Sequence, residues 1–104
     1  MTDTQTTVYL RCIMETYFGG EDASEEYECE IKINNKNILI SYLGDNGMPV
    51  VWTGNDDSAS GHYTLTCPSV AGKATLHRAP NTDRLEGSWL ESGYTGMWRI
   101  ELDN

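Results

Sequence analysis

Few side chains in this chain of 104 residues have both the type and the spacing that catalysis requires. His62 and His77 match no His-x-x-His or His-Glu-x-x-His spacing, and both fall at outward positions of the strands predicted below. A single histidine that points outward is typical of a protein surface rather than of a catalytic site. The chain also lacks a Gly-x-Ser-x-Gly motif and a phosphate-binding glycine loop. We therefore expect no enzymatic activity, no catalytic residue and no cofactor.

Potential metal ligands are equally scattered along the chain. Cys12, Cys29 and Cys67 are too widely spaced for a CxxC-type site, and their inward strand positions indicate small core residues. A disulfide between two of them is left open. Asp45-x-Gly47 and Asn55-Asp56-Asp57 carry oxygen ligands that calcium accepts, but they lack the spacing of an EF-hand and are better explained as turns. We expect no metal site.

Aromatic residues have more potential for recognition than any other type. Trp52, Tyr63, Trp89 and Trp98 are predicted to point inward, with Tyr94 as a further candidate. Rings with a polar tip suit an apolar pocket that contains a few hydrogen-bonding groups. The first functional hypothesis is therefore a small apolar or aromatic ligand at one open end of the fold, with Trp52, Tyr63 and Tyr94 lining the cavity. The alternative is that the rings only fill a narrow core.

The charge of the chain favours some partners over others. Seven basic residues against sixteen acidic ones give a formal net charge of −9, which argues against a nucleic-acid partner and an anionic membrane surface. Acidic residues gather at Glu21, Asp22, Glu25, Glu26 and Asp56-Asp57. A second hypothesis is therefore an acidic interaction module, of the inhibitor or immunity type, that covers a basic protein surface.

The C-terminal segment shows most clearly how the aromatic residues are positioned. It contains two Gly-x-Trp copies that fold onto each other if Ser92-Gly93 forms a two-residue turn. The cross-strand pairs are then Trp89 with Gly96, Gly87 with Trp98, Glu86 with Arg99 and Arg84 with Glu101. Each indole lies across from a glycine, so two large rings fit on one face of the sheet.

The rest of the chain consists of short alternating runs separated by turn residues, as in antiparallel sheets. The predicted strands are residues 7–17, 27–33, 37–43, 48–53, 61–67 and 72–78, followed by the two strands of the final hairpin. In the first strand, Val8, Leu10, Cys12 and Met14 are predicted to share the inward face. Eight strands with short connections predict a single all-β domain over residues 1–104, an up-and-down meander barrel. A two-sheet sandwich or a half-open barrel is the alternative.

The Leu85-x-Gly87-x-Trp89 phrase on a meander of short strands resembles calycin barrels such as avidins and lipocalins. The resemblance covers this short segment and implies barrel architecture. The Gly-x-Trp of lipocalins belongs near the start of the chain, whereas here it lies at the end. The biotin-binding residues of avidins have no matching register in this sequence, so none is carried over.

The composition also suggests a compartment. No apolar run approaches the ~20 residues of a membrane-spanning helix. Residues 1–7 contain neither a basic nor an apolar stretch of the kind found in signal peptides. An odd number of cysteines without an export signal indicates reduced thiols. We therefore expect a cytoplasmic protein.

Overall fold

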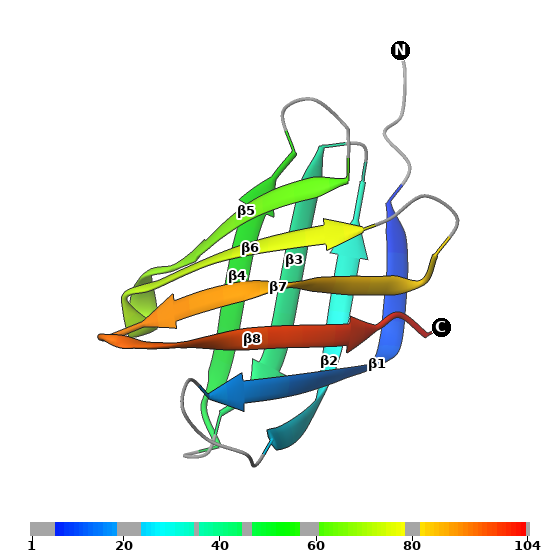
Figure 1. Ribbon diagram of the computed structural model, residues 1–104. Helices are drawn as coiled ribbons and strands as arrows, with labels where there is room; N and C mark the ends of the chain where they lie inside the picture. The colour runs from blue at the N-terminus through cyan, green and yellow to red at the C-terminus, as the bar shows by residue number, and fades with distance from the viewer. Residues whose placement is uncertain are drawn as a thin grey trace.

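The computed structural model shows a closed barrel of eight antiparallel strands in which each strand pairs with the next and β8 pairs with β1 (Figure 1). The structure describes residues 6–18, 24–34, 36–44, 47–56, 61–78 and 82–103. The strands are β1 (Thr7–Phe18), β2 (Ser24–Ile33), β3 (Asn37–Leu43), β4 (Pro49–Asn55), β5 (His62–Cys67), β6 (Gly72–Arg78), β7 (Arg84–Glu91) and β8 (Tyr94–Glu101). The predicted up-and-down meander barrel is confirmed.

Helical structure is minor in the described ranges. The short 3-10 turn η1 (Pro68–Val70) connects β5 to β6, at the position of a predicted turn. None of the helical structure described here is long or apolar enough to cross a membrane. Pro49 begins β4, a position that suits a residue with no backbone N–H to donate to an interior ladder.

The C-terminal hairpin, β7 and β8, forms in the predicted register. Trp89 pairs with Gly96, and Gly87 pairs with Trp98. Ser92 has a φ of 49° and Gly93 a φ of 89°. Positive φ at both central residues is the geometry of a type I′ turn, whose twist matches that of the flanking strands.

The two hairpin glycines make room for different neighbours. A Cβ atom on Gly96 would lie 2.6 Å from Cζ2 of Trp89 and 1.9 Å from the carbonyl oxygen of Tyr17. The Trp89 ring therefore covers Gly96, as predicted. A Cβ atom on Gly87 would instead lie 1.7 Å from the carbonyl oxygen of Thr75. The close approach of β6, rather than the facing indole, is thus the tightest constraint at Gly87.

A bulge in β1 reverses the predicted orientation of its first half. The register with β2 shifts between Tyr9 and Cys12, where β1 contains one residue more than its partner strand. One extra residue moves the preceding side chains to the other face of the sheet. Tyr9 consequently packs against the core, while Val8 and Leu10 are 38% and 62% exposed. The prediction that Val8 and Leu10 face inward is wrong, because strict alternation does not include a bulge.

Aliphatic and sulfur-containing side chains fill the middle of the barrel. The residues with the least exposure there are Met14, Ile31, Ile40, Leu65, Leu76, Leu85 and Ile100. All three cysteines are free and buried, which confirms the prediction of core positions. Burial raises the pKa of Cys29 to about 12, so this thiol stays protonated and behaves as an apolar core group.

The contact between Gly96 and Trp89 predicts the effect of a substitution. Gly96→Val is expected to destabilise the protein by more than the ~1 kcal/mol of a strand-propensity change, because the indole and the Tyr17 carbonyl must both move. Met97→Val, at the exposed next position of β8, is the matched control. Urea unfolding measures both variants, and equal midpoints would contradict the packing of Trp89 over Gly96.

Candidate functional site: an aromatic cleft at the barrel mouth

One end of the barrel is hollow. A cleft of about 490 Å³ opens at the end that holds η1 and the β7–β8 turn, on the left and lower side of Figure 1. Its volume lies in the range of small-molecule sites. The described lining residues are Thr16, Phe18, Tyr27, Tyr42, Gly44, Val50, Val70, Trp89, Glu91, Ser92, Tyr94 and Trp98.

Aromatic rings in mutual contact form most of the wall of this cleft. Phe18 meets Trp89 edge-on with ring centroids 5.5 Å apart, and Trp89 lies 6.5 Å from Trp98. Tyr27 and Tyr42, on β2 and β3, are 5.4 Å apart. Aromatic pairs at these separations stabilise each other beyond their burial. The rings that border the cleft are therefore held in place by contacts with one another.

Trp52 lies beneath the cleft, where it contacts two of the lining residues without being one of them. Its side chain is 0% exposed and meets Trp98 edge-on at 4.9 Å, although β4 and β8 lie on opposite sides of an eight-stranded barrel. Its Nε1 donates a hydrogen bond of 3.2 Å to the hydroxyl of Tyr42. A Cβ atom on Gly72 would come within 2.3 Å of Cη2 of Trp52, so the glycine is what admits the ring. The indole spans the lumen and separates the cleft from the filled core.

Glu91 and Tyr42 are the polar groups of this aromatic setting whose pKa values are shifted by burial. Glu91 is half-buried and is the one charged side chain in the described lining. Its partial burial raises the pKa of its carboxyl group. Burial also raises the pKa of Tyr42 to about 12, an effect that the hydrogen bond from Trp52 opposes. The Tyr42 hydroxyl is therefore protonated at neutral pH and retains a hydrogen to donate.

The structure distributes the five candidate ligand-binding residues over three levels of the barrel. Trp89 and Trp98 line the cleft while most of each ring is buried, and Tyr94 lies at the rim with 72% exposure. Trp52 lies beneath them, outside the lining. Tyr63 begins the inward alternation of β5, at the end of the barrel away from the cleft. Among the described residues, the cleft therefore includes Tyr94 but neither Trp52 nor Tyr63 in its lining.

Sequence reasoning did not assign most of the described lining residues to the site. Among those it missed are Phe18, Tyr27, Val70 and Glu91. A signal existed for Glu91, because it follows Leu85, Gly87 and Trp89 at inward positions of the same strand. An inward position at the last step of a strand opens onto the mouth, where a charged side chain still reaches water.

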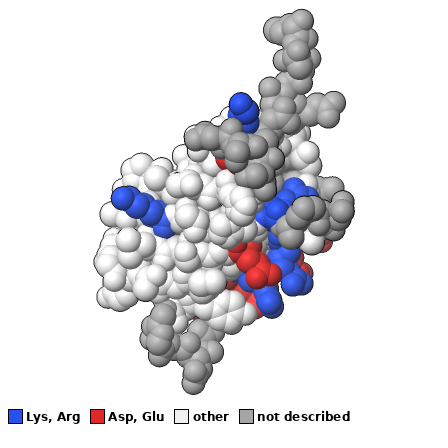
Figure 2. Space-filling model, turned by 45° about the horizontal axis from the view of Figure 1, so that its top comes forward, with Lys and Arg blue, Asp and Glu red and all other residues white. Residues whose placement is uncertain are grey.

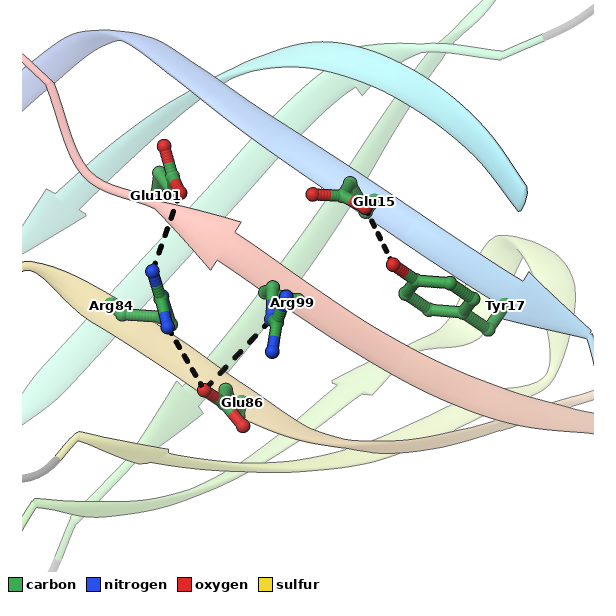
Figure 3. Close-up of polar contacts among 6 residues, drawn as sticks. All are labelled: Glu15, Tyr17, Arg84, Glu86, Arg99 and Glu101. Carbon is green, nitrogen blue, oxygen red and sulfur yellow. Dashed lines mark hydrogen bonds and ion pairs between the residues drawn. The ribbon is translucent and has the colours of Figure 1, made fainter.

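A larger hollow of about 620 Å³ on the outer surface is a weaker candidate. Its lining includes Arg84, whose guanidinium group lies 3.8 Å from Glu86 and 3.5 Å from Glu101. Glu86 also contacts Arg99 at 4.0 Å (Figure 3). These contacts confirm the predicted cross-strand ion pairs, and Figure 2 shows basic and acidic atoms intermixed in such a cluster on one face. The charges around this hollow already neutralise each other.

His62 and His77 face each other across β5 and β6. Their Nδ1 atoms are 2.5 Å apart, and both side chains are exposed, as predicted. Neither is buried beside a carboxylate, which is the arrangement expected of a general base held in one orientation. Across the described ranges, no three His, Cys, Asp or Glu side chains come close enough together to hold a metal ion.

The acidic loops predicted from the sequence are described only in part. Glu21, Asp22, Asp45 and Asp57 lie outside the described residues. Asp56 is buried, and its Oδ2 accepts a hydrogen bond of 2.6 Å from the backbone N–H of Gly61. This contact agrees with the interpretation of Asp56 as a residue that shapes the loop.

Comparison with known proteins adds no relative: no family model, no curated protein and no solved structure matches the chain. A function must therefore be inferred from the cleft itself. Its aromatic wall and the few polar groups within it together have the composition of a small-molecule site.

The raised pKa of Tyr42 predicts a pH dependence of stability. Its pKa is about 12 in the folded protein against 10.0 for an unperturbed tyrosine, so the protonated form favours folding. This stabilisation is present below about pH 10 and is lost as the pH rises through about 12. Tyr42→Phe should therefore lose less stability than the wild type over this interval. Urea unfolding at several alkaline pH values measures the difference, and parallel curves would contradict the burial of this hydroxyl.

Proposed function

We propose that this protein is a non-enzymatic binding protein that holds a small apolar or aromatic molecule in the mouth of its barrel. The observation that carries the proposal is the cleft of about 490 Å³ whose wall is a set of contacting aromatic rings above the indole of Trp52. A barrel with a packed core alone has no need for a hollow of this size at one end. Rings held by their neighbours give a ligand a largely preformed site.

The expected affinity is moderate. Burying roughly 200 Å² of apolar ligand surface at about 25 cal/mol per Å² gives about 5 kcal/mol before the costs of association. Taken alone, this free energy would correspond to a dissociation constant of about 0.2 mM, and a preformed site keeps the costs of association that weaken it small. The Tyr42 hydroxyl and the Glu91 carboxylate can add hydrogen bonds that orient the ligand.

Two further expectations accompany this proposal. The three buried free thiols are consistent with a reducing, cytoplasmic setting. The resemblance of Leu85-x-Gly87-x-Trp89 to calycin barrels supports the same general class of protein. It says nothing about which ligand is bound.

A second candidate function is the covering of a basic protein surface. Glu26, Glu28 and Glu30 alternate along β2 on its outer face. Beside them, Leu10 and Leu43 are largely exposed and border a shallow hollow together with Glu28 and Glu30. Acidic groups around apolar side chains suit a partner whose interface is basic and partly apolar.

A cleft-filling substitution tests ligand binding at the mouth. The probe is N-phenyl-1-naphthylamine, a neutral aromatic molecule whose fluorescence rises in apolar surroundings. Val50→Phe places a larger ring in the cleft and should weaken binding at least about tenfold, since the probe and the new ring compete for one volume. Val51→Phe, at the adjacent exposed position, is the control and should bind as the wild type does. Absence of binding to the wild type, or equal binding by both variants, would overturn the proposal.

Native mass spectrometry of the protein purified from its own host separates the two candidate functions. A retained mass of a few hundred daltons that Val50→Phe abolishes would support the ligand. A stoichiometric protein partner that is retained by Val50→Phe but lost in Glu28→Lys would support the acidic surface instead.

A further inference from the structure

We propose that the cleft selects a positively charged ligand, a small aromatic or alkylated ammonium ion, with Glu91 as its counter-charge. This inference rests on the proposed function and specifies the class of molecule that the same site binds. Three observations support it. Glu91 has no cationic partner among the described residues, the described lining contains no basic side chain, and aromatic rings surround the cleft.

Glu91 is an anion without a cation in the described parts of the chain. It lies on the inward side of β7, opposite Tyr94 on one neighbouring strand and Gly72 on the other. None of the ion pairs formed among the described residues includes it. Its partial burial raises the pKa of its carboxyl group, and no charged neighbour contributes to that shift. A cationic ligand in the cleft would provide the missing partner.

Two hydrogen-bond donors of the cleft are used within the protein. The indole N–H of Trp89 donates to the carbonyl oxygen of Met97 at 3.3 Å. The Ser92 hydroxyl donates to the carbonyl oxygen of Val70 at 2.9 Å. No lysine or arginine is present in the described lining. An anionic ligand would therefore find few groups to pair with here.

Two tyrosines complete the same pattern. Tyr27 donates its hydroxyl hydrogen to a carboxylate oxygen of Glu25 at 2.7 Å, so this donor is used within the protein. The Tyr42 hydroxyl accepts the N–H of Trp52 and keeps its own hydrogen for a ligand, and Thr16 and Tyr94 add further hydroxyls to the lining. The described lining therefore offers a bound molecule one carboxylate and several neutral hydroxyls, and it contains no cationic side chain.

The aromatic rings that line the cleft also attract cations. The face of an aromatic ring carries negative electrostatic potential, and indole is the strongest of the three aromatic side chains in binding a cation within about 6 Å. Trp89, Trp98 and Tyr27 all line the cleft that Glu91 enters. A cation here would lie beside the accessible parts of these rings and a carboxylate at once. The net charge of −9 would in addition raise its local concentration.

The test compares three ligands of similar shape and different charge by NMR titration of the wild type. They are phenyltrimethylammonium, the neutral tert-butylbenzene and the anionic benzenesulfonate. We expect the cation to bind at least about tenfold more tightly than the neutral molecule, and the anion to cause no saturable shifts. In Glu91→Gln the preference for the cation should fall to about threefold or less, with the affinity for tert-butylbenzene unchanged.

Glu28→Gln is the matched control, because it removes the same charge from the outer face of β2. It should keep the preference for the cation. An equal loss in Glu28→Gln and Glu91→Gln would assign the effect to the overall charge and overturn the role of Glu91. Equal binding of cation and neutral molecule by the wild type would overturn this inference but leave the proposed function standing. Failure of all three ligands and of N-phenyl-1-naphthylamine to bind would overturn both.

Discussion

The contact of Trp52 with Trp98 across the lumen determines how the interior of this barrel is divided. An eight-stranded barrel has an interior just wide enough for side chains to fill, so one indole that reaches from β4 to the opposite wall closes it at that level. Gly72 makes the contact possible, because any side chain there would occupy the place of the ring. On one side of this level lies a core of buried aliphatic side chains, and on the other side lies the cleft.

The same rings serve stability and recognition. Trp89 and Trp98 are almost fully buried, yet the part of each that remains accessible lines the cleft. Their positions are set by strong local constraints, with Trp89 packed over Gly96 and Trp98 against Trp52. Binding is therefore expected to involve little rearrangement of the wall. The outer ion pairs of β7 and β8, by contrast, are solvent-exposed and contribute little to either property.

Much of the fold could be predicted because its determinants are local. The Ser92-Gly93 turn and the two Gly-x-Trp copies specify the register of the last hairpin, and alternation indicates the inward faces of the strands. The bulge in β1 escaped prediction because it depends on how this strand pairs with β2, which the alternation within β1 does not reveal. Alternation predicts on which face of the sheet a side chain lies, but not how far along the barrel axis it lies.

The candidate site was therefore predicted only in part. Strand direction reverses at each step of a meander, so Tyr63 at the start of β5 and Tyr94 at the start of β8 lie at opposite ends. The separation of these two tyrosines follows from the predicted topology. The same topology places Glu91 beside Tyr94 at the mouth. The place of Trp52 beneath the cleft does not follow from it, because the height at which a ring crosses the lumen depends on the stagger of all eight strands.

The division of the barrel by Trp52 is tested most directly by intermolecular NOEs between bound N-phenyl-1-naphthylamine and the aromatic side chains. A solid core below Trp52 predicts NOEs from the ligand to ring protons of Trp89, Trp98 and Tyr94, and none to Tyr63. NOEs to Tyr63, or a ligand bound only to the outer surface, would contradict the closure of the lumen by Trp52.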